Sequence, residues 1–273
     1  MTTVQKENID VEVALVTILG SGTVVPSLRR SSCSFLLEAE GQKFLFDIGP
    51  GTMHRLLEAG TAISEIDLLL LSHLHPDHSG ELASLLFATK YPETYRRRSP
   101  FTLAGAKGLR KFFNGLTGVY GDWIVLPEDI FCLKELDNRM PDCLSAGNLL
   151  VRSRPVAHTE SSIGYRVVTP GGISVAYSGD TELCDSLVEL ARGVDLFLCE
   201  CSLPDEMKVS GHMTPSEAGK AAATAGVKRL VLTHFYPECD GVDIVLQCRK
   251  TWQGPLTLAE DLMVIKLPSF TSH

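Results

Sequence analysis

Three short segments of the chain have the length of one β-strand and an apolar centre: IDLLLLS at 66–72, VDLFLCE at 194–200 and KRLVLTH at 228–234. A run without alternating polar residues is typical of a strand buried on both faces, as in a parallel sheet covered by helices. Residues 214–226 begin with Thr-Pro-Ser-Glu, a helix-capping box with proline at the first helical position. The alternation of strands and helices predicts an α/β fold.

Weaker patterns extend this alternation over most of the chain. Segments rich in strand-forming residues predict further strands at 13–20, 33–38, 43–48, 100–105, 149–158, 164–169 and 171–180, with a hairpin formed by the last two. Helices are expected at 52–60, around 82–86, at 107–114 and at 182–192. Residues 115–147 show no clear element. Because no long linker, repeat or low-complexity tract divides the sequence, we expect a single domain over residues 1–273.

The composition is that of an ordinary folded protein. Of the 273 residues, 44% are hydrophobic and 21% are charged, which is enough apolar material for a sizeable core. The formal net charge of −8 argues against a surface that holds long nucleic acid. No apolar run reaches ~18 residues, so we expect no membrane-spanning helix. The N-terminal segment carries acidic residues and no apolar stretch, unlike a secretory signal, which favours a cytoplasmic location.

The eight cysteines of the chain include no Cys-x-x-Cys pair. A chain of this length does not need disulfides, so buried, reduced thiols in a cytoplasmic protein are expected. Cys199 and Cys201 would share one face of a strand. Packing in the core is favoured for them over a soft metal site.

Potential metal ligands are concentrated in LSHLHPDHSG, directly after the apolar strand at 66–72. His73, His75, Asp77 and His78 are four such ligands within six residues. Buried histidine and aspartate need partners, and this cluster would be costly without a cation. In an extended segment His73 and His75 point to one side and can hold one ion, whereas Asp77 and His78 diverge toward a second. Imidazole with carboxylate suits zinc, manganese or iron rather than calcium.

Three more residues of the same kind each follow an apolar strand: His158, Asp180 and His234. The carboxyl ends of strands are where α/β sheets present functional groups. Gly179, before Asp180, allows the backbone to approach a ligand closely. Each of the three alone could be a cap or a hydrogen-bonded histidine. Together with the H-x-H-x-D-H segment they favour a dinuclear metal site.

The H-x-H-x-D-H segment, followed by a distant His, Asp and His, resembles the ligand pattern of hydrolases with the metallo-β-lactamase fold. TILGSGTVVPSLRRSSCSFLLE, FLFDIGPGT and SGHMTPSEAG are similar to the ribonuclease Z-like, phosphodiesterase branch of that family. The resemblance covers nearly the whole chain. It implies a four-layer αβ/βα sandwich of two mixed β-sheets flanked by helices.

The resemblance also implies a role for each residue of the pattern. The metal ligands would be His73, His75 and His158 for one ion, Asp77, His78 and His234 for the other, and Asp180 between the two. Two divalent ions are implied, with zinc favoured and manganese or iron as alternatives. A hydroxide shared by the ions would attack phosphorus. Asp77 would also accept or orient its proton.

Two further residues take roles from the resemblance. His212 would protonate the leaving oxygen or stabilise charge on the transition state, the alternative being a surface histidine at a helix N-terminus. Asp47 would hydrogen-bond a ligand histidine, or else cap the turn after its strand.

We therefore expect a cytoplasmic hydrolase of a small anionic phosphodiester, such as a cyclic nucleotide, a cyclic sugar phosphate or a short ester. The tRNA-processing members of the ribonuclease Z branch insert a long arm between the ligand His and the bridging Asp, but here 22 positions separate His158 from Asp180. With the net charge of −8, this spacing disfavours a tRNA 3′-endonuclease. A lactone or thioester hydrolase of the same fold stays open, as does a metal-dependent sensor without turnover. Dimers are common in the family, so a homodimer is an open expectation.

Arg96, Arg97 and Arg98 follow the expected helix after the metal motif. Placed over the cleft they would attract an anionic substrate, although a solvated loop is favoured. Tyr91 and Tyr95 would form an aromatic wall nearby or simply pack.

Overall fold

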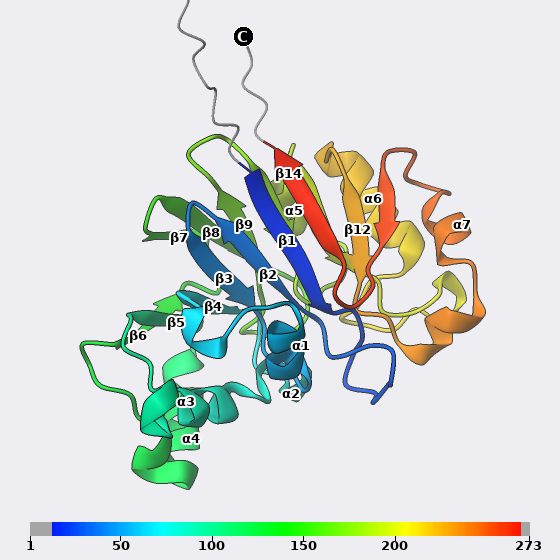
Figure 1. Ribbon diagram of the computed structural model, residues 1–273. Coiled ribbons are helices and arrows are strands. Elements are labelled where there is room, and N and C mark those ends of the chain that lie inside the picture. The colour runs from blue at the N-terminus through cyan, green and yellow to red at the C-terminus, as the bar shows by residue number, and fades with distance from the viewer. Residues whose placement is uncertain (1–12, 269–273) are drawn as a thin grey trace, which may run out of the picture.

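The computed structural model describes residues 13–268, which form two β-sheets that face each other (Figure 1). The first sheet has the strand order β14-β1-β2-β3-β4-β5-β6. The bounds of its strands are β1 Val13–Gly20, β2 Ser34–Ala39, β3 Gln42–Phe46, β4 Leu68–Leu71, β5 Phe101–Ala106, β6 Phe131–Leu136 and β14 Val264–Pro268. Neighbours from β3 to β6 are parallel and those from β14 to β3 are antiparallel, so this sheet is mixed.

The second sheet has the order β13-β12-β11-β10-β9-β8-β7. The bounds of its strands are β7 Asp142–Ala146, β8 Leu149–Pro155, β9 Ile163–Val168, β10 Ser174–Tyr177, β11 Leu196–Glu200, β12 Leu230–Thr233 and β13 Leu256–Leu258. Strands β10 to β13 are parallel neighbours, and β7 to β10 are antiparallel. The carboxyl ends of β8, β10, β11 and β12 therefore lie along one edge of this sheet.

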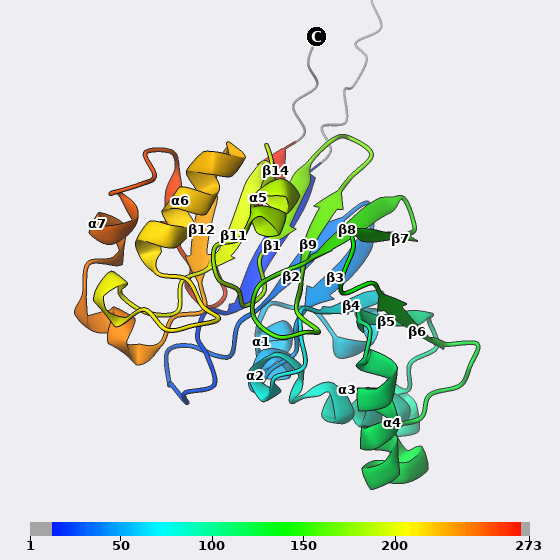
Figure 2. The ribbon, with the colours of Figure 1, turned by 180° about the vertical axis from the view of Figure 1, so that it is seen from behind.

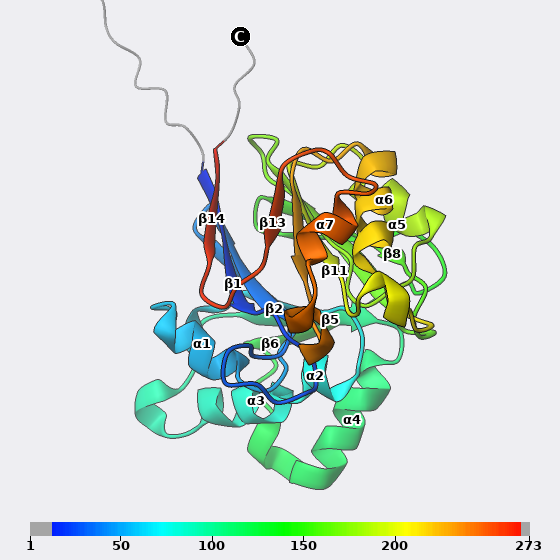
Figure 3. The same ribbon diagram turned by 90° about the vertical axis from the view of Figure 1, so that its right-hand side faces the viewer.

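Helices cover the outer faces of both sheets. Their bounds are α1 Thr52–Glu58, α2 Pro76–Ser79, α3 Leu82–Lys90, α4 Leu109–Tyr120, α5 Asp185–Ala191, α6 Pro215–Ala225 and α7 Ile244–Cys248. Short 3-10 turns are η1 Ile63–Glu65, η2 Glu93–Tyr95, η3 Gly121–Ile124, η4 Asp205–Met207 and η5 Pro237–Gly241. Helices α1, α3 and α4 pack on the first sheet, and α5 and α6 on the second (Figure 2). Figure 3 shows the two sheets from the side, with α5 and α6 outside the second.

Alternation along β2 explains why there are two cores. Phe35 and Leu37 face the core between the sheets, whereas Leu36 faces the smaller core under α1, α3 and α4. Phe35 stacks on Phe46 of the same sheet at 4.2 Å and meets Tyr177 of the other sheet edge-on at 5.1 Å. These apolar and aromatic contacts hold the sheets together. The four layers predicted from the resemblance are confirmed.

The expected strands and helices occur, but four strands have no counterpart in the predicted elements. Two of them, β6 and β7, lie in the stretch 115–147 that showed no clear element, at the edges of their sheets. Both are largely solvent-exposed, so few apolar residues mark them. The other two, β13 and β14, are the opposite edges. Helix α4 also runs to Tyr120, beyond the predicted end at residue 114.

The cysteines are free thiols, and five of the eight are buried. Cys132 and Cys143 differ from the expectation because they lie on the exposed faces of the edge strands β6 and β7. No helix within residues 13–268 has both the length and the apolar character needed to cross a membrane.

Gly49, in the loop after β3, packs tightly against the helix α2. A Cβ atom there would lie 1.8 Å from the backbone oxygen of Asp77 and 2.5 Å from the Cβ of Ser32. Only a residue without a side chain fits between the backbone of Asp77 and the side chain of Ser32.

We therefore expect Gly49→Ala to lower the free energy of unfolding by about 1–3 kcal/mol, because the added methyl group must push α2 away. Gly115→Ala is the matched control, since a Cβ at this position in α4 meets nothing within 4 Å. It should raise stability by up to about 1 kcal/mol through helix propensity. Urea denaturation measures both changes. An unchanged midpoint for Gly49→Ala would show that the contact is not restrictive.

Candidate metal centre

The H-x-H-x-D-H segment lies where the carboxyl ends of strands from both sheets come together. Strand β4 ends at Leu71, and His73 and the short helix α2 follow it. On the opposite sheet, residues just after β8, β10 and β12 supply His158, Asp180 and His234. The backbone N–H of Ile163 donates to the carbonyl of Ser72 at 2.9 Å, which ties the two edges together beside the motif.

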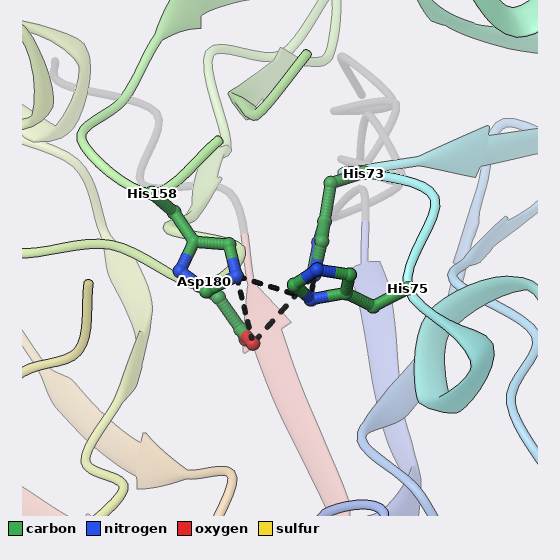
Figure 4. A group of neighbouring side chains, drawn as sticks. All are labelled: His73, His75, His158 and Asp180. Atoms are coloured by element: carbon green, nitrogen blue, oxygen red, sulfur yellow. Dashed lines mark hydrogen bonds and ion pairs between the residues drawn. The ribbon is translucent and has the colours of Figure 1, made fainter. Parts of the chain in front are cut away.

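The first group of side chains is His73, His75, His158 and Asp180 (Figure 4). Nδ1 of His75 lies 3.0 Å from Nε2 of His73 and 3.2 Å from Nε2 of His158. Oδ2 of Asp180 lies 3.7 Å from His73 Nε2 and 3.9 Å from His158 Nε2. All four atoms lie within 4.8 Å of one another, so they can face one ion.

A second group lies on the other side of Asp180. Nε2 of His78 and Nε2 of His234 are 3.3 Å apart, and Oδ2 of Asp77 lies 3.9 Å and 3.7 Å from them, respectively. The other oxygen of Asp180, Oδ1, lies 3.3 Å from His78 Nε2 and 3.4 Å from His234 Nε2. The two carboxylate oxygens of Asp180 thus face different nitrogen groups.

The environment of the Asp180 carboxylate is the strongest evidence that this cluster binds a cation. The Asp180 side chain is buried and its Oδ1 atom has no hydrogen-bond partner among the described residues. Burial would raise the pKa of this carboxyl, but the imidazoles of His234 and His78 lower it well below its ordinary value. Burial, followed by the nearby His78, lowers the pKa of His73, which favours the neutral imidazole that binds metals. The donor set and the unpartnered oxygen fit divalent ions.

Asp47 orients His78 from behind. Its Oδ2 lies 2.8 Å from Nδ1 of His78, and it also accepts hydrogen bonds from the hydroxyls of Ser72 and Tyr177 at 2.8 Å. The backbone N–H of Ser72 donates to Oδ1 at 2.7 Å. This fully buried carboxylate therefore fixes the ring so that Nε2 of His78 faces Asp180. Asp47 has a φ of 59°, a conformation that turns the chain sharply after β3.

His212 reaches the cluster from the loop before α6. Its Nδ1 lies 3.0 Å from Oε1 of Glu200 and 3.0 Å from the hydroxyl of Ser202, and 3.9 Å from Oδ2 of Asp180. Helix α6 begins at Pro215, and Thr214 and Glu217 form the capping box at its start, as the sequence predicts, which fixes the end of the loop.

Glu200 and Ser202 are residues of this site that the sequence analysis missed. Glu200 is buried at the end of β11 and accepts from the backbone N–H groups of Thr181 and Met213 at 2.8 and 3.1 Å. The hydroxyl of Ser202 lies 2.9 Å from Nδ1 of His234 and 2.7 Å from Oε2 of Glu200, to which it donates. Position at a strand end, the signal used for Asp180 and His234, also marks Glu200.

Comparison with known proteins decides the family. Residues 42–235 match the family model described as the beta-lactamase superfamily domain. The chain belongs to the beta-lactamase superfamily. It is 36% identical over 244 residues to the uncharacterized protein Rv1339 of Mycobacterium tuberculosis, covering 88% of each chain. It is 28% identical to ribonuclease Z of Methanothermobacter thermautotrophicus, over 94% of this chain and 98% of that one.

Among solved structures, human tRNase Z in its short form has a TM-score of 0.74 and 28% identity, over 92% of this chain and 98% of that chain. These relatives, with the fold and the His/Asp cluster, identify this member of the beta-lactamase superfamily as a metal-dependent hydrolase.

The arginines after α3 do not lie free over the cluster of this beta-lactamase superfamily protein. Arg97 is buried and donates to the carbonyls of Ile66 and Ile63 at 2.8 and 2.7 Å, so it holds η1 in place. Arg96 and Arg98 both pair with Glu93. They are structural or surface groups in this arrangement.

A cavity of about 990 Å³ is also separate from the proposed ligands. Its walls come from α3, the end of α4 and η3, and they include Phe87, Tyr91 and Trp123. These three rings lie 5.5–6.0 Å from one another. Tyr91 therefore contacts other aromatic rings, although it is 41% exposed, and Tyr95 is 70% exposed.

Asp47→Asn tests whether this carboxylate supports metal binding. We expect the affinity for zinc to fall about 10- to 100-fold, because Asn keeps the shape but removes the charge that orients His78. Competition with a chromophoric chelator measures the affinity. Asp67→Asn is the matched control, since Asp67 precedes β4, lies at the opposite end of the parallel β3–β4 pair from Asp47, and accepts from the N–H of Lys43. Equal zinc affinity in the two variants would contradict the role of Asp47.

Proposed function

We propose that this protein is a dinuclear metal-dependent phosphodiesterase that hydrolyses a small phosphodiester, such as a cyclic nucleotide, a cyclic sugar phosphate or a short ester. The observation that carries the proposal is the buried Asp180, whose two oxygens face two separate groups of nitrogen atoms. Two ions held by these two groups would be suited to a displacement at phosphorus.

The proposal assigns the ligands by group. His73, His75 and His158 would hold one ion, Asp77, His78 and His234 the other, and Asp180 would contact both. Zinc is favoured, with manganese or iron as alternatives, because the donors are imidazole and carboxylate. When bound, these ions supply a Lewis acid for the phosphoryl oxygen and water with a pKa near neutral.

The protein's own residues supply the proton transfers in this proposal. His212 would protonate the leaving oxygen through Nε2, because its Nδ1 is engaged with Glu200 and Ser202. Burial opposes protonation of His212, but the hydrogen bond and charge of Glu200 raise its pKa and favour the acid form. Asp77 would orient the attacking water with its carboxylate.

The short segment between the candidate ligands His158 and Asp180 supports a small substrate. The chain from His158 to Asp180 forms β9 and β10, a short antiparallel pair, with no room for a protruding arm. The alignment with the ribonuclease Z from Methanothermobacter thermautotrophicus runs over 305 positions, more than the 273 residues of this chain, so the relative has segments that this chain lacks. The net charge of −8 adds an electrostatic barrier to binding tRNA.

A lactone or thioester hydrolase is the alternative, because the same ligands would also activate water toward a carbonyl carbon. A turnover screen of the metal-loaded protein separates the two. Its panel contains bis-p-nitrophenyl phosphate, 3′,5′-cyclic nucleotides, lactones and thioesters, each with zinc or manganese. We expect turnover of the phosphodiesters. Reaction of the carbonyl substrates alone would overturn the proposal, and bound metal without any turnover would favour a sensor.

His212→Ala tests the proposed acid. Turnover of a cyclic nucleotide should fall ~10²-fold or more, because its alkoxide leaving group needs a proton. The loss should be smaller for bis-p-nitrophenyl phosphate, since p-nitrophenolate leaves without one. His54→Ala, at an exposed position of α1, is the control. Equal losses on both substrates would exclude His212 as the general acid.

A further inference from the structure

We propose that Tyr236 positions the substrate by donating its phenol hydrogen to a non-bridging oxygen of the phosphoryl group. The inference rests on the proposed function and adds to it a residue that no part of the ligand pattern contains. Tyr236 follows the candidate ligand His234 by two positions, just before the 3-10 turn η5.

The ring of Tyr236 is held against the cluster by two histidines. It meets His212 edge-on at 6.4 Å with planes 77° apart, and His234 edge-on at 6.1 Å with planes 79° apart. These two imidazoles are themselves nearly parallel, 5.6 Å apart. The tyrosine ring thus stands across the proposed acid and a candidate ligand at once.

The backbone of Tyr236 is fixed as well. Its N–H donates to the carbonyl of Ser202 at 3.1 Å, and its carbonyl accepts from the N–H of Cys239 at 3.0 Å. Ser202 also contacts His212 and His234 through its hydroxyl. Ser202 therefore contacts both imidazoles and also anchors the backbone of the tyrosine.

The phenol group of Tyr236 has no partner within residues 13–268, and its side chain is only partly buried. The two tyrosines buried between the sheets behave differently. Tyr165 donates to the carbonyl of Leu71 at 2.7 Å, and Tyr177 donates to Asp47 at 2.8 Å. Because a tyrosine hydroxyl in a partly desolvated place usually finds an acceptor, the hydroxyl of Tyr236 is available for a bound ligand.

Two cationic side chains that contact neighbours of Tyr236, namely His212 and Phe235, are already engaged with protein acceptors. Lys208 donates to the carbonyl of His212 and pairs with Glu217. Arg30 lies over the ring of Phe235 and binds Ser21 and Asp240. His212 and Tyr236 are therefore the two donors that the proposal assigns to the substrate, His212 to the leaving oxygen and Tyr236 to the phosphoryl oxygen.

A donor to the phosphoryl oxygen and a donor to the leaving oxygen have different kinetic signatures. A hydrogen bond to the phosphoryl group acts on every phosphodiester, whatever its leaving group. A proton donor matters most for a poor leaving group. The two roles can therefore be distinguished with the same pair of substrates.

Tyr236→Phe keeps the ring and its contacts with the two imidazoles and removes only the hydroxyl. We expect kcat/KM to fall about 10- to 100-fold, by the same factor on bis-p-nitrophenyl phosphate and on a cyclic nucleotide. Calorimetric titration of the metal-loaded protein with inorganic phosphate should show a weaker affinity. The metal content should equal that of the unmodified protein. Tyr95→Phe, at an exposed position in η2, should change none of these values.

Each outcome decides a separate point. Unchanged turnover and unchanged phosphate affinity in Tyr236→Phe would overturn the inference and leave the proposed function intact. A loss confined to the cyclic nucleotide would reassign the hydroxyl to the leaving group, and a loss of metal would make its role structural; both results overturn it. If the unmodified protein hydrolyses no phosphodiester, the proposed function fails, but the phosphate titration still tests Tyr236 because it needs no turnover.

Discussion

A buried carboxylate with five imidazoles within 4 Å of it is the feature on which this site depends. Asp180 lies between the two histidine groups, and its Oδ1 atom makes no hydrogen bond to the described residues. An aspartate in such a place is stable only with positive charge around it. The imidazoles can carry that charge in part, but their crowding within a few ångströms makes this costly, and metal ions relieve both problems at once.

The fold supplies this arrangement through strand ends rather than through a single loop. Asp180 follows Gly179, where a Cβ atom would lie 2.8 Å from the Cβ of Ser72 on the other sheet. This close approach lets a residue of one sheet reach histidines that follow β4 in the other. Around it, Asp47 and Glu200, also at strand ends, hold His78 and His212 by hydrogen bonds. The carboxylates of Asp47 and Glu200 thus fix the orientation of these two imidazoles.

Much of this could be predicted from the sequence, because the signals are local. The H-x-H-x-D-H segment and the apolar strands that end in His or Asp identify the clustered residues, and the structure brings them together. Glu200 was not recognised because it lies between two cysteines that suggested core packing. Its role depends on His212, which is 12 positions away and reaches it only in the fold. The edge strands β6 and β7 were missed because exposed strands carry little apolar pattern. The sequence also did not predict that Arg97 is buried and donates to two backbone carbonyls, because its neighbours in sequence are surface arginines.

The division of the candidate ligands between the two sheets has a mechanical consequence. The first sheet positions four of them, which follow β4, and the second sheet positions three, which follow β8, β10 and β12: His73, His75, Asp77 and His78, and His158, Asp180 and His234, respectively. Ions held by both sets would connect the two sheets at one edge of the sandwich, in addition to the aromatic contacts between the sheets. A ligand that binds only the folded state stabilises that state. The supply of metal would therefore affect the stability of the packing between the two sheets as well as the activity of the enzyme.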